Sequence, residues 1–535
     1  MPRMRIDKLG SIGLNTDVQP YLLPPQAWTK MINCSTQDGE LRSAVGERKL
    51  FDLQIRPIYH TAFRSVSGVQ YLIVSDGASV HAYTITGVGE DITPTTDETP
   101  VPWSGGVVSF TNLNGILVVN SRSDGPFYWG GPGTDLVALP GWNADWRCRQ
   151  MVAYRYYLVA VNMSEGGNLF PHKVRWSGSA AEGELPTVWV AAPDNDAGSD
   201  LIGDTPGAIV GAEMVRDSLF VVKEDAVYDM HWIGGDFIMT LARMVGSSGG
   251  TRLEKGFTNI GGALGIFTTS DLIAFDGQAG RSLADQRIRS GLFTAISTEL
   301  WEFSQLFYAV SQSILVVAIV DAGYRHLSRA FTLNLEENTW GVRQLHNGYG
   351  FDNALVESVD GVPTWDEMGP GVPYNMPEPL WTQGGTWDEQ TDGTWNKGVY
   401  RPSTPDIIVY ESSADDASWW VSVLAIGTGN HDGTAKYCMA ERVAVPIGDA
   451  SRPYMVTELW PEMRGEAPVT LWVGSQDAPN GSVRWDGPFP FKPTVDVHIT
   501  PRVTGRFVSL RVESEAIGDW SFGAISMQYE SAGDR

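Results

Sequence analysis

Short apolar runs separated by compact polar turns dominate the chain up to about residue 344. From about residue 56, a run rich in β-branched and aromatic residues is followed by a turn of Asp, Asn, Ser or Gly and then by a second apolar run. This alternation is typical of β-hairpins. Six such hairpins lie in residues 69–83, 115–129, 156–176, 218–230, 264–275 and 313–333. They recur at intervals of roughly 40–60 residues, the span of a four-stranded propeller blade.

The pattern therefore predicts an all-β protein with a β-propeller-like body over residues 56–359. An irregular pair of β-sandwiches is the alternative, because the hairpins lack a strict repeat signature such as Gly-His with Trp-Asp. One helix is expected. Ser297 can cap a segment in which Leu300, Phe303 and Phe307 follow helical spacing.

The pattern changes after residue 359. Residues 360–405 are rich in Pro, Gly, Trp and acids, with near-copies of one Thr-Trp motif at Trp365, Trp387 and Trp395. In such an insertion or linker, the tryptophans either cover the surface of the long loop itself or are exposed and contact sugars or proteins. Apolar runs resume at 407–410, 419–424, 470–473 and 507–512 and predict a smaller C-terminal β-sandwich over residues 406–535. Residues 1–55 form an N-terminal arm and first hairpin.

The composition indicates a folded protein with an acidic surface. Hydrophobic residues make up 42% and charged residues 19% of the chain, which is ordinary for a globular protein. The 38 Lys+Arg against 63 Asp+Glu give a net charge of −25, which argues against binding to nucleic-acid phosphates. The sequence has no signal-peptide core and no apolar run of about 18 residues. We therefore expect cytoplasmic synthesis and no membrane-spanning segment.

The sequence assigns no catalytic, cofactor-binding or metal-ligating residue, and we expect a protein that is not an enzyme. No GxSxG elbow, Walker loop or well-placed GxGxxG occurs. The histidines are scattered without metal-ligand spacing; they are His60, His81, His172, His231, His326, His346, His431 and His498. The three cysteines, Cys34, Cys148 and Cys438, form no CxxC pair and are expected to be buried.

Two segments have a functional interpretation beside a structural one. Ser121–Trp129 loosely resembles a sialidase turn, but a hairpin turn before an aromatic strand explains it more simply. The acid-rich loop from Asp194 to Asp204 offers calcium ligands, although it lacks the spacing of an EF-hand loop. Carboxylates are abundant enough for a glycosidase pair, yet the sequence singles none out.

Several stretches of the chain together carry a resemblance to one known family. The first is the opening segment with Leu23–Thr29, Asn33, Asp38–Arg42 and Gly46, in which an aromatic-polar turn and an Asn precede a hairpin and a Gly. The others are Trp189 with the Asp194–Asp204 loop, the hairpin Ser218–Trp232 with Lys223-Glu224 at its turn, and Leu272–Gly277. With the Trp-rich insertion, these stretches resemble the tail nozzle (tail hub, tubular B-type or DNA-stabilisation) proteins of short-tailed bacteriophages. The resemblance covers most of residues 20–400.

The resemblance implies a non-enzymatic virion component without a cofactor. Its body would be propeller-like, and six copies would form a ring below the portal-adaptor proteins. Genomic DNA would pass through this ring without specific binding, and tail fibres or tailspikes would dock nearby. A propeller lectin or receptor-binding adhesin is the alternative, since 20 Trp can stack on sugars. A propeller glycosidase is a further alternative.

Two windows carry most of the net negative charge of the chain. Residues 193–236 contain ten acids against Arg216 and Lys223, and residues 351–425 contain thirteen against Lys397 and Arg401. Carboxylates on a channel wall make phosphate contacts unfavourable, so a polyanion slides without sticking. We therefore expect part of this charge to line a DNA channel. A merely soluble acidic exterior is the alternative.

Overall fold

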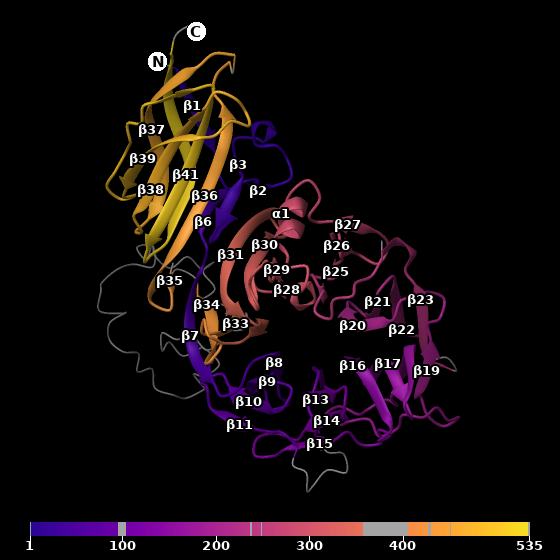
Figure 1. Cartoon of the computed structure of the whole chain (residues 1–535). Helices are drawn as coiled ribbons and strands as arrows, with labels where there is room; N and C mark the ends of the chain where they lie inside the picture. The colour runs from indigo at the N-terminus through magenta and orange to yellow at the C-terminus, as the bar shows by residue number, and fades with distance from the viewer. Residues whose placement is uncertain are drawn as a thin grey trace, which may run out of the picture.

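The computed structural model describes residues 2–94, 103–235, 238–247, 249–356, 405–425, 430–449 and 451–532. Two β lobes are visible in Figure 1: a ring of sheets, and an elongated sandwich at whose far end both chain termini lie. The Trp-rich segment with Trp365, Trp387 and Trp395 lies outside the described residues.

The ring is a β-propeller whose blades are four-stranded antiparallel sheets. Blade 1 comprises β8 (Tyr59–Arg64), β9 (Gln70–Ser75), β10 (Val80–Thr84) and β11 (Gly89–Asp91). Blade 2 comprises β12 (Val108–Leu113), β13 (Ile116–Ser121), β14 (Gly125–Trp129) and β15 (Leu136–Ala138). Blade 3 comprises β16 (Trp146–Tyr154), β17 (Tyr157–Glu165), β18 (Asn168–Trp176) and β19 (Gly198–Leu201). Blade 4 comprises β20 (Ile209–Val215), β21 (Ser218–Lys223), β22 (Val227–Trp232) and β23 (Met239–Arg243).

Three further blades complete the ring. Blade 5 comprises β24 (Phe257–Asn259), β25 (Leu264–Phe267), β26 (Leu272–Phe275) and β27 (Gly280–Ser282). Blade 6 comprises β28 (Gln305–Ala309), β29 (Ile314–Ile319), β30 (Leu327–Asn334) and β31 (Thr339–Gly348). Blade 7 comprises β32 (Gly350–Ala354), β33 (Asp406–Ser412), β34 (Trp419–Ala425) and, from the start of the chain, β7 (Gly46–Leu53). The innermost strands β8, β12, β16, β20, β24, β28 and β32 each contact the next, and β32 contacts β8. Within the described ranges, the ring therefore has seven blades.

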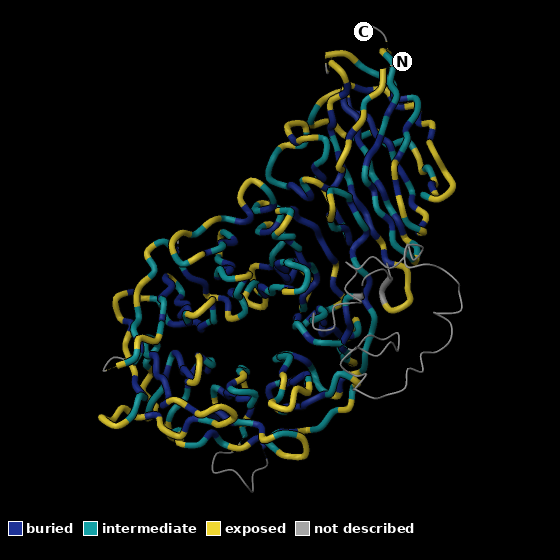
Figure 2. Tube along the Cα trace, turned by 180° about the vertical axis from the view of Figure 1, so that it is seen from behind, coloured by how far each residue is buried: buried dark blue, intermediate teal, exposed yellow. Residues whose placement is uncertain are grey.

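The six predicted hairpins are confirmed as the second and third strands of blades 1 to 6. Their apolar runs are nearly continuous because both faces of each blade pack against a neighbour. In β29, for example, every residue from Leu315 to Ile319 is buried. The buried positions in Figure 2 accordingly lie within the blades, and exposed positions gather at the connecting loops.

The second lobe is a sandwich of two sheets. One sheet contains β1 (Arg3–Asp7), β6 (Glu40–Ser43), β37 (Tyr454–Gly465), β40 (Val503–Gly505) and β42 (Trp520–Ser531). The other contains β4 (Lys30–Ile32), β35 (Asn430–His431), β36 (Thr434–Pro446), β38 (Val469–Gln476), β39 (Arg484–Phe491) and β41 (Phe507–Ala516). The predicted sandwich is thus present, and the N-terminal arm supplies three of its strands.

Both sandwich sheets continue into the propeller. Blade 6 is joined through β31 to β5 (Cys34–Gln37), which pairs with β6 and so with the first sandwich sheet. Blade 7 is joined through β7 and β35 to β36 of the second sheet. Short strands β2 (Gly13–Leu14) and β3 (Ala27–Trp28) pair beside blade 6. The two lobes are therefore connected by continuous backbone hydrogen bonding.

Two expectations differ from the structure. The residues 406–425 that were assigned to the sandwich form β33 and β34 of blade 7, because only they can complete the blade that β32 begins and β7 ends. The helix expected from Ser297 is wrong. Ser297 Oγ does accept a hydrogen bond from the Leu300 amide, but only a 3-10 turn, η3 (Trp301–Phe303), follows before β28 pairs with β29.

The α-helix of the described residues is α1 (Arg289–Ala295). Its first amides, those of Arg289 and Ser290, donate to the carboxylate of Asp17 at 3.0 and 2.7 Å. This cap comes from the distant N-terminal arm, so no local signal marked the helix. Two further 3-10 turns are η1 (Pro20–Leu22) and η2 (Val245–Ser247). No helix among the described residues is long and apolar enough to cross a membrane.

Candidate functional site

Charged side chains from several blades meet near the propeller axis. Glu254, in the loop before β24, accepts hydrogen-bonded ion pairs from Arg122 at 2.9 Å and from Arg149 at 3.0 Å. Arg122 follows β13 of blade 2, Arg149 lies on β16 of blade 3, and Glu254 belongs to blade 5. The ion pairs therefore link blades that are not neighbours in the ring. Burial alone would raise the pKa of Glu254, but the two guanidinium groups outweigh it and hold this pKa below its ordinary value.

A second chain of contacts lies beside these ion pairs. Asp352 on β32 lies 2.9 Å from Nδ1 of His60 on β8, and His60 Nε2 lies 3.4 Å from Lys255 Nζ. The Tyr410 ring stacks on the imidazole with ring centroids 4.2 Å apart. Burial, with the nearby Lys255 charge, lowers the pKa of His60, so the imidazole is neutral at pH 7.

The loop that carries Glu254 and Lys255 is held by backbone contacts to both adjacent blades. Gly250 packs so closely on blade 4 that a Cβ would lie 1.7 Å from the Lys223 carbonyl oxygen. The Thr251 amide donates to that same carbonyl, and Thr251 Oγ1 donates to the Phe267 carbonyl at 2.6 Å. The amide of Leu306 donates to the Lys255 carbonyl at 2.7 Å. These contacts fix the direction in which the two charged side chains leave the loop.

Glu213 is a third unusual group and lies on the innermost strand of blade 4. It forms no ion pair within the described ranges. Burial raises the pKa of this carboxyl to about 7, opposed only by the backbone amide of Asn259.

A separate ionic cluster joins the two lobes. Glu47 on β7 accepts from Arg343 on β31, with Nε at 2.8 Å, and lies 3.5 Å from Lys436 Nζ on β36. All three residues are at most 5% exposed. The side chains of Glu47, His346 and Glu411 also approach within 4.8 Å. Because Arg343 and Lys436 already balance carboxylate charge there, the geometry fits an ion-pair junction better than a metal centre.

The segments that the sequence singled out have structural roles. Ser121–Trp129 forms the β13–β14 turn and strand β14, with Ser121 Oγ donating to Asp124 at 3.0 Å, so the structural interpretation is confirmed. In the Asp194–Asp204 loop, Asp196 accepts from the Tyr157 hydroxyl at 2.9 Å, and no three acids of this loop converge within the described ranges. The three cysteines are buried, as expected.

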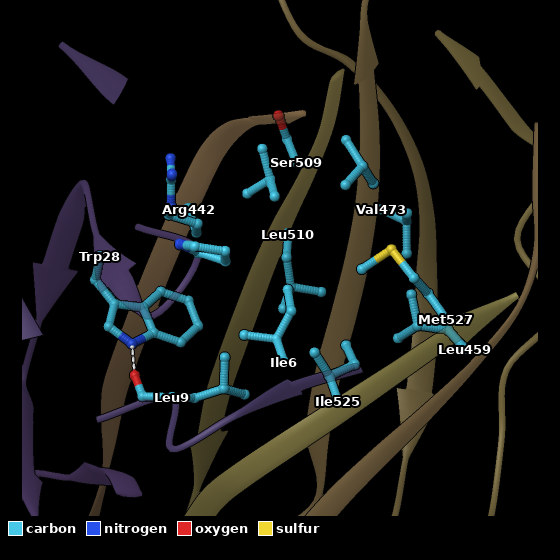
Figure 3. A pocket seen from close by; sticks show the side chains of 13 residues that line it. Ile6, Leu9, Trp28, Arg442, Leu459, Val473, Ser509, Leu510, Ile525 and Met527 are labelled. Carbon is cyan, nitrogen blue, oxygen red and sulfur yellow. Dashed lines mark hydrogen bonds between the residues drawn. The ribbon is translucent and has the colours of Figure 1, made fainter. Parts of the chain in front are cut away.

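A small cavity in the sandwich has a volume of about 20 Å³ and is lined mainly by apolar side chains. Figure 3 shows Ile6, Leu459 and Met527 facing it, and the Trp28 indole donating to the Leu9 carbonyl at 2.6 Å. A volume of this size holds at most about one water molecule. The cavity is a packing defect and not a ligand site.

The axial cluster could not be predicted from the sequence, because its residues come from distant parts of the chain. His60 and Asp352 are 292 positions apart, and His60 and Lys255 are 195 apart. In the sequence, each of these three is an isolated polar residue in or beside a predicted strand. Only the closure of the ring brings them together, so no local motif could have revealed them.

No family model and no curated protein matches the sequence. Among solved structures, the chain is similar to streptogramin B lyase, with 10% identity and a TM-score of 0.33 over 57% of this chain and 91% of that chain. It is also similar to a gluconolactonase from Xanthomonas campestris, with 12% identity and a TM-score of 0.30 over 56% of this chain and 96% of that chain. At these values the comparisons carry no argument about function. The propeller assignment follows from the sheet order itself.

Proposed function

We propose that this chain is a structural subunit of a short-tailed bacteriophage tail, forming the nozzle ring below the portal-adaptor proteins. The observation that carries the proposal is the connection between the lobes. Sheets continuous from blades 6 and 7 into the sandwich, together with the buried Glu47–Arg343–Lys436 cluster, make the two lobes one body. A single body of this kind suits a ring subunit that retains DNA under pressure.

The segment that resembles tail nozzle proteins builds this connection. Asn33 Nδ2 donates to the Tyr437 carbonyl at 2.8 Å, and Asn33 Oδ1 accepts from the Gln344 amide at 2.7 Å. The resembling Asp38-Gly39 turn joins β5 to β6, and Gly46 begins β7. The opening stretch of the resemblance therefore lies where propeller and sandwich join, which supports a shared architecture.

The axial ion pairs limit where DNA can pass through the proposed ring. Arg122, Arg149 and Glu254 occupy the axis of the single propeller. The major groove of duplex DNA alone is about 12 Å wide, so a duplex cannot pass between groups that are in hydrogen-bond contact. In our proposal the DNA channel therefore lies between the copies of the ring and not through each propeller.

The acidic windows fit this arrangement. Asp194, Asp200, Asp217 and Asp225 are exposed on β19, on turns and on loops of blades 3 and 4. Asp236, Lys397 and Arg401 lie outside the described residues. We infer that blades 3 and 4 face the lumen, where their carboxylates repel phosphate over the Debye length of about 8 Å.

The absence of enzymatic activity is part of the proposal. The axial carboxylates of Glu254 and Asp352 are each bound to a cationic or imidazole group, so neither of these two is available as the free acid or base of a glycosidase pair. Hydrolysis assays with glycosides and phosphate esters should show no specific turnover.

Assembly is the decisive test. Purified chain mixed with portal-adaptor complex should form a six-fold ring of about 351 kDa, six copies of 58.5 kDa, in cryo-microscopy and light scattering. Three-fold or twelve-fold symmetry would contradict the proposed ring. Binding to duplex DNA at physiological salt would contradict the acidic lumen. Specific signals on a glycan array, without ring formation, would favour an adhesin instead.

A further inference from the structure

Three residues from different blades form a relay at the axis. The Asp352 carboxylate accepts from His60 Nδ1 at 2.9 Å, which fixes the imidazole tautomer and leaves the Nε2 lone pair facing Lys255. Nε2 lies 3.4 Å from Lys255 Nζ. The stacked Tyr410 ring and the close approach of Gly350, where a Cβ would lie 2.2 Å from Nε2, hold the imidazole in place.

Lys255 lacks the partner that normally keeps a lysine protonated. Within the described ranges no carboxylate lies within 4.0 Å of its ammonium. Glu254, its neighbour in the chain, binds Arg122 and Arg149 instead, and Asp352 binds His60. Burial therefore lowers the pKa of Lys255 to about 8, although the charges of Asp352 and Glu254 act in the opposite direction.

We propose that Lys255 is a nucleophilic amine that forms an imine with small aldehydes or ketones reaching the propeller axis. His60 Nε2 takes one proton from the ammonium, and the amine lone pair adds to the carbonyl carbon. One of the two remaining amine protons moves to the carbonyl oxygen, which gives the carbinolamine. The proton on His60 then passes to the hydroxyl, which leaves as water while the nitrogen lone pair forms the C=N bond. The balance is one ammonium and one carbonyl compound giving one protonated imine and one water. This inference does not depend on the assembly proposed above.

The expected selectivity follows from the neutral fraction of the amine. At pH 7 a lysine with a pKa of about 8 has roughly 300 times the neutral fraction of one at 10.5. Lower basicity and the confined position offset part of this advantage. We therefore expect Lys255 to react at least about tenfold faster than an exposed lysine such as Lys8.

The test traps the imine on the full-length chain. Acetaldehyde and sodium cyanoborohydride, which delivers hydride to the imine carbon and leaves a secondary amine, are added at pH 7, and peptide mass spectrometry gives the labelling rate at each lysine. Lys255 should be labelled at least about ten times faster than Lys8, and the advantage should disappear in 8 M urea, where all lysines have ordinary pKa values. A native rate at or below that of Lys8, or a ratio unchanged by urea, would overturn the proposal.

Two variants separate chemistry from structure. Lys255→Arg keeps the charge and should lose labelling at this position alone. His60→Gln keeps a polar partner that cannot take up a proton, so it should slow Lys255 labelling at least about fivefold, within the usual range of base catalysis, without slowing Lys8. Circular dichroism checks that each variant is folded. An unchanged Lys255 rate in folded His60→Gln would refute the role of His60, and if that variant does not fold, the native-against-urea comparison still decides.

Discussion

Glu47→Gln should lower the free energy of unfolding of the chain. Among the substitutions of charged residues that we propose, it should have the largest effect. Glu47 is 1% exposed and lies between the Arg343 guanidinium and the Lys436 ammonium, which come from blade 6 and from the sandwich. Gln has nearly the same shape but carries no charge. The substitution therefore leaves two buried cations without their shared carboxylate.

The magnitude follows from that burial. Removing one partner of a buried ion pair costs about 3–5 kcal/mol, because the remaining charge stays desolvated and uncompensated. Burial already lowers the pKa of Lys436 to about 8, so this lysine can lose its proton and relieve part of the cost. We therefore expect a loss near the lower limit, about 3 kcal/mol. With an unfolding entropy of about 2.1 cal/mol/K per residue, this corresponds to a fall of roughly 3 °C in the Tm of the 535-residue chain.

The control is an exposed ion pair of the same chemical kind. Asp477 pairs with Arg484 at 2.9 Å, but both side chains are about 60% exposed, so Asp477→Asn should cost at most about 1 kcal/mol. Differential scanning calorimetry at pH 7 compares the two variants. Equal Tm shifts of the two variants, or a Glu47→Gln shift below about 1 °C, would refute the view that the junction depends on a desolvated charge cluster.

Two other predictions concern single groups. Trp28→Phe leaves the buried Leu9 carbonyl without its hydrogen-bond donor. Trp520→Phe is the control, because the indole N–H of Trp520 has no hydrogen-bond partner among the described residues. In urea unfolding, Trp28→Phe should therefore lower the free energy of unfolding by about 1–3 kcal/mol more than Trp520→Phe. Glu213 has a folded pKa of about 7, above its unfolded value of about 4.3, so the stability it contributes below pH 4.3 is lost as pH rises through 7. The Glu213→Gln variant has no ionisable group at this position, so it does not lose this stability as the pH rises. Its Tm advantage over the natural chain should therefore grow between pH 5 and 8, and a pH-independent difference would contradict the raised pKa of Glu213.

The blades could be predicted from the sequence because each is local. A run such as Leu315–Ile319 and its partner on β30 lie within one short stretch, and burial on both faces makes the run apolar throughout. Blade 7 could not be predicted in this way. Its strands β7, β32, β33 and β34 come from residues 46–53, 350–354 and 406–425, so neither the hairpin spacing nor the repeat interval marks them.

The axial site was hidden for a related reason. In the sequence, His60 and Asp352 are ordinary strand residues, and a charged loop residue such as Lys255 is most often solvated. Their chemistry depends on the distance between them, which only the closed ring sets. The absence of motifs in the sequence therefore said little about the axis.

Ring closure and lobe attachment depend on the same short N-terminal segment. β7 completes blade 7 by pairing with β34, and it also contacts β35 of the sandwich. The preceding hairpin, β5 with β6, links blade 6 to β42 near the other end of the chain. Pairings this distant in sequence form late, because a long loop must be closed before any contact compensates for the lost entropy. The propeller therefore closes, and its axial residues come together, only once the N-terminal segment has bound strands from the last third of the chain, so folding of the axis and attachment of the sandwich are a single event.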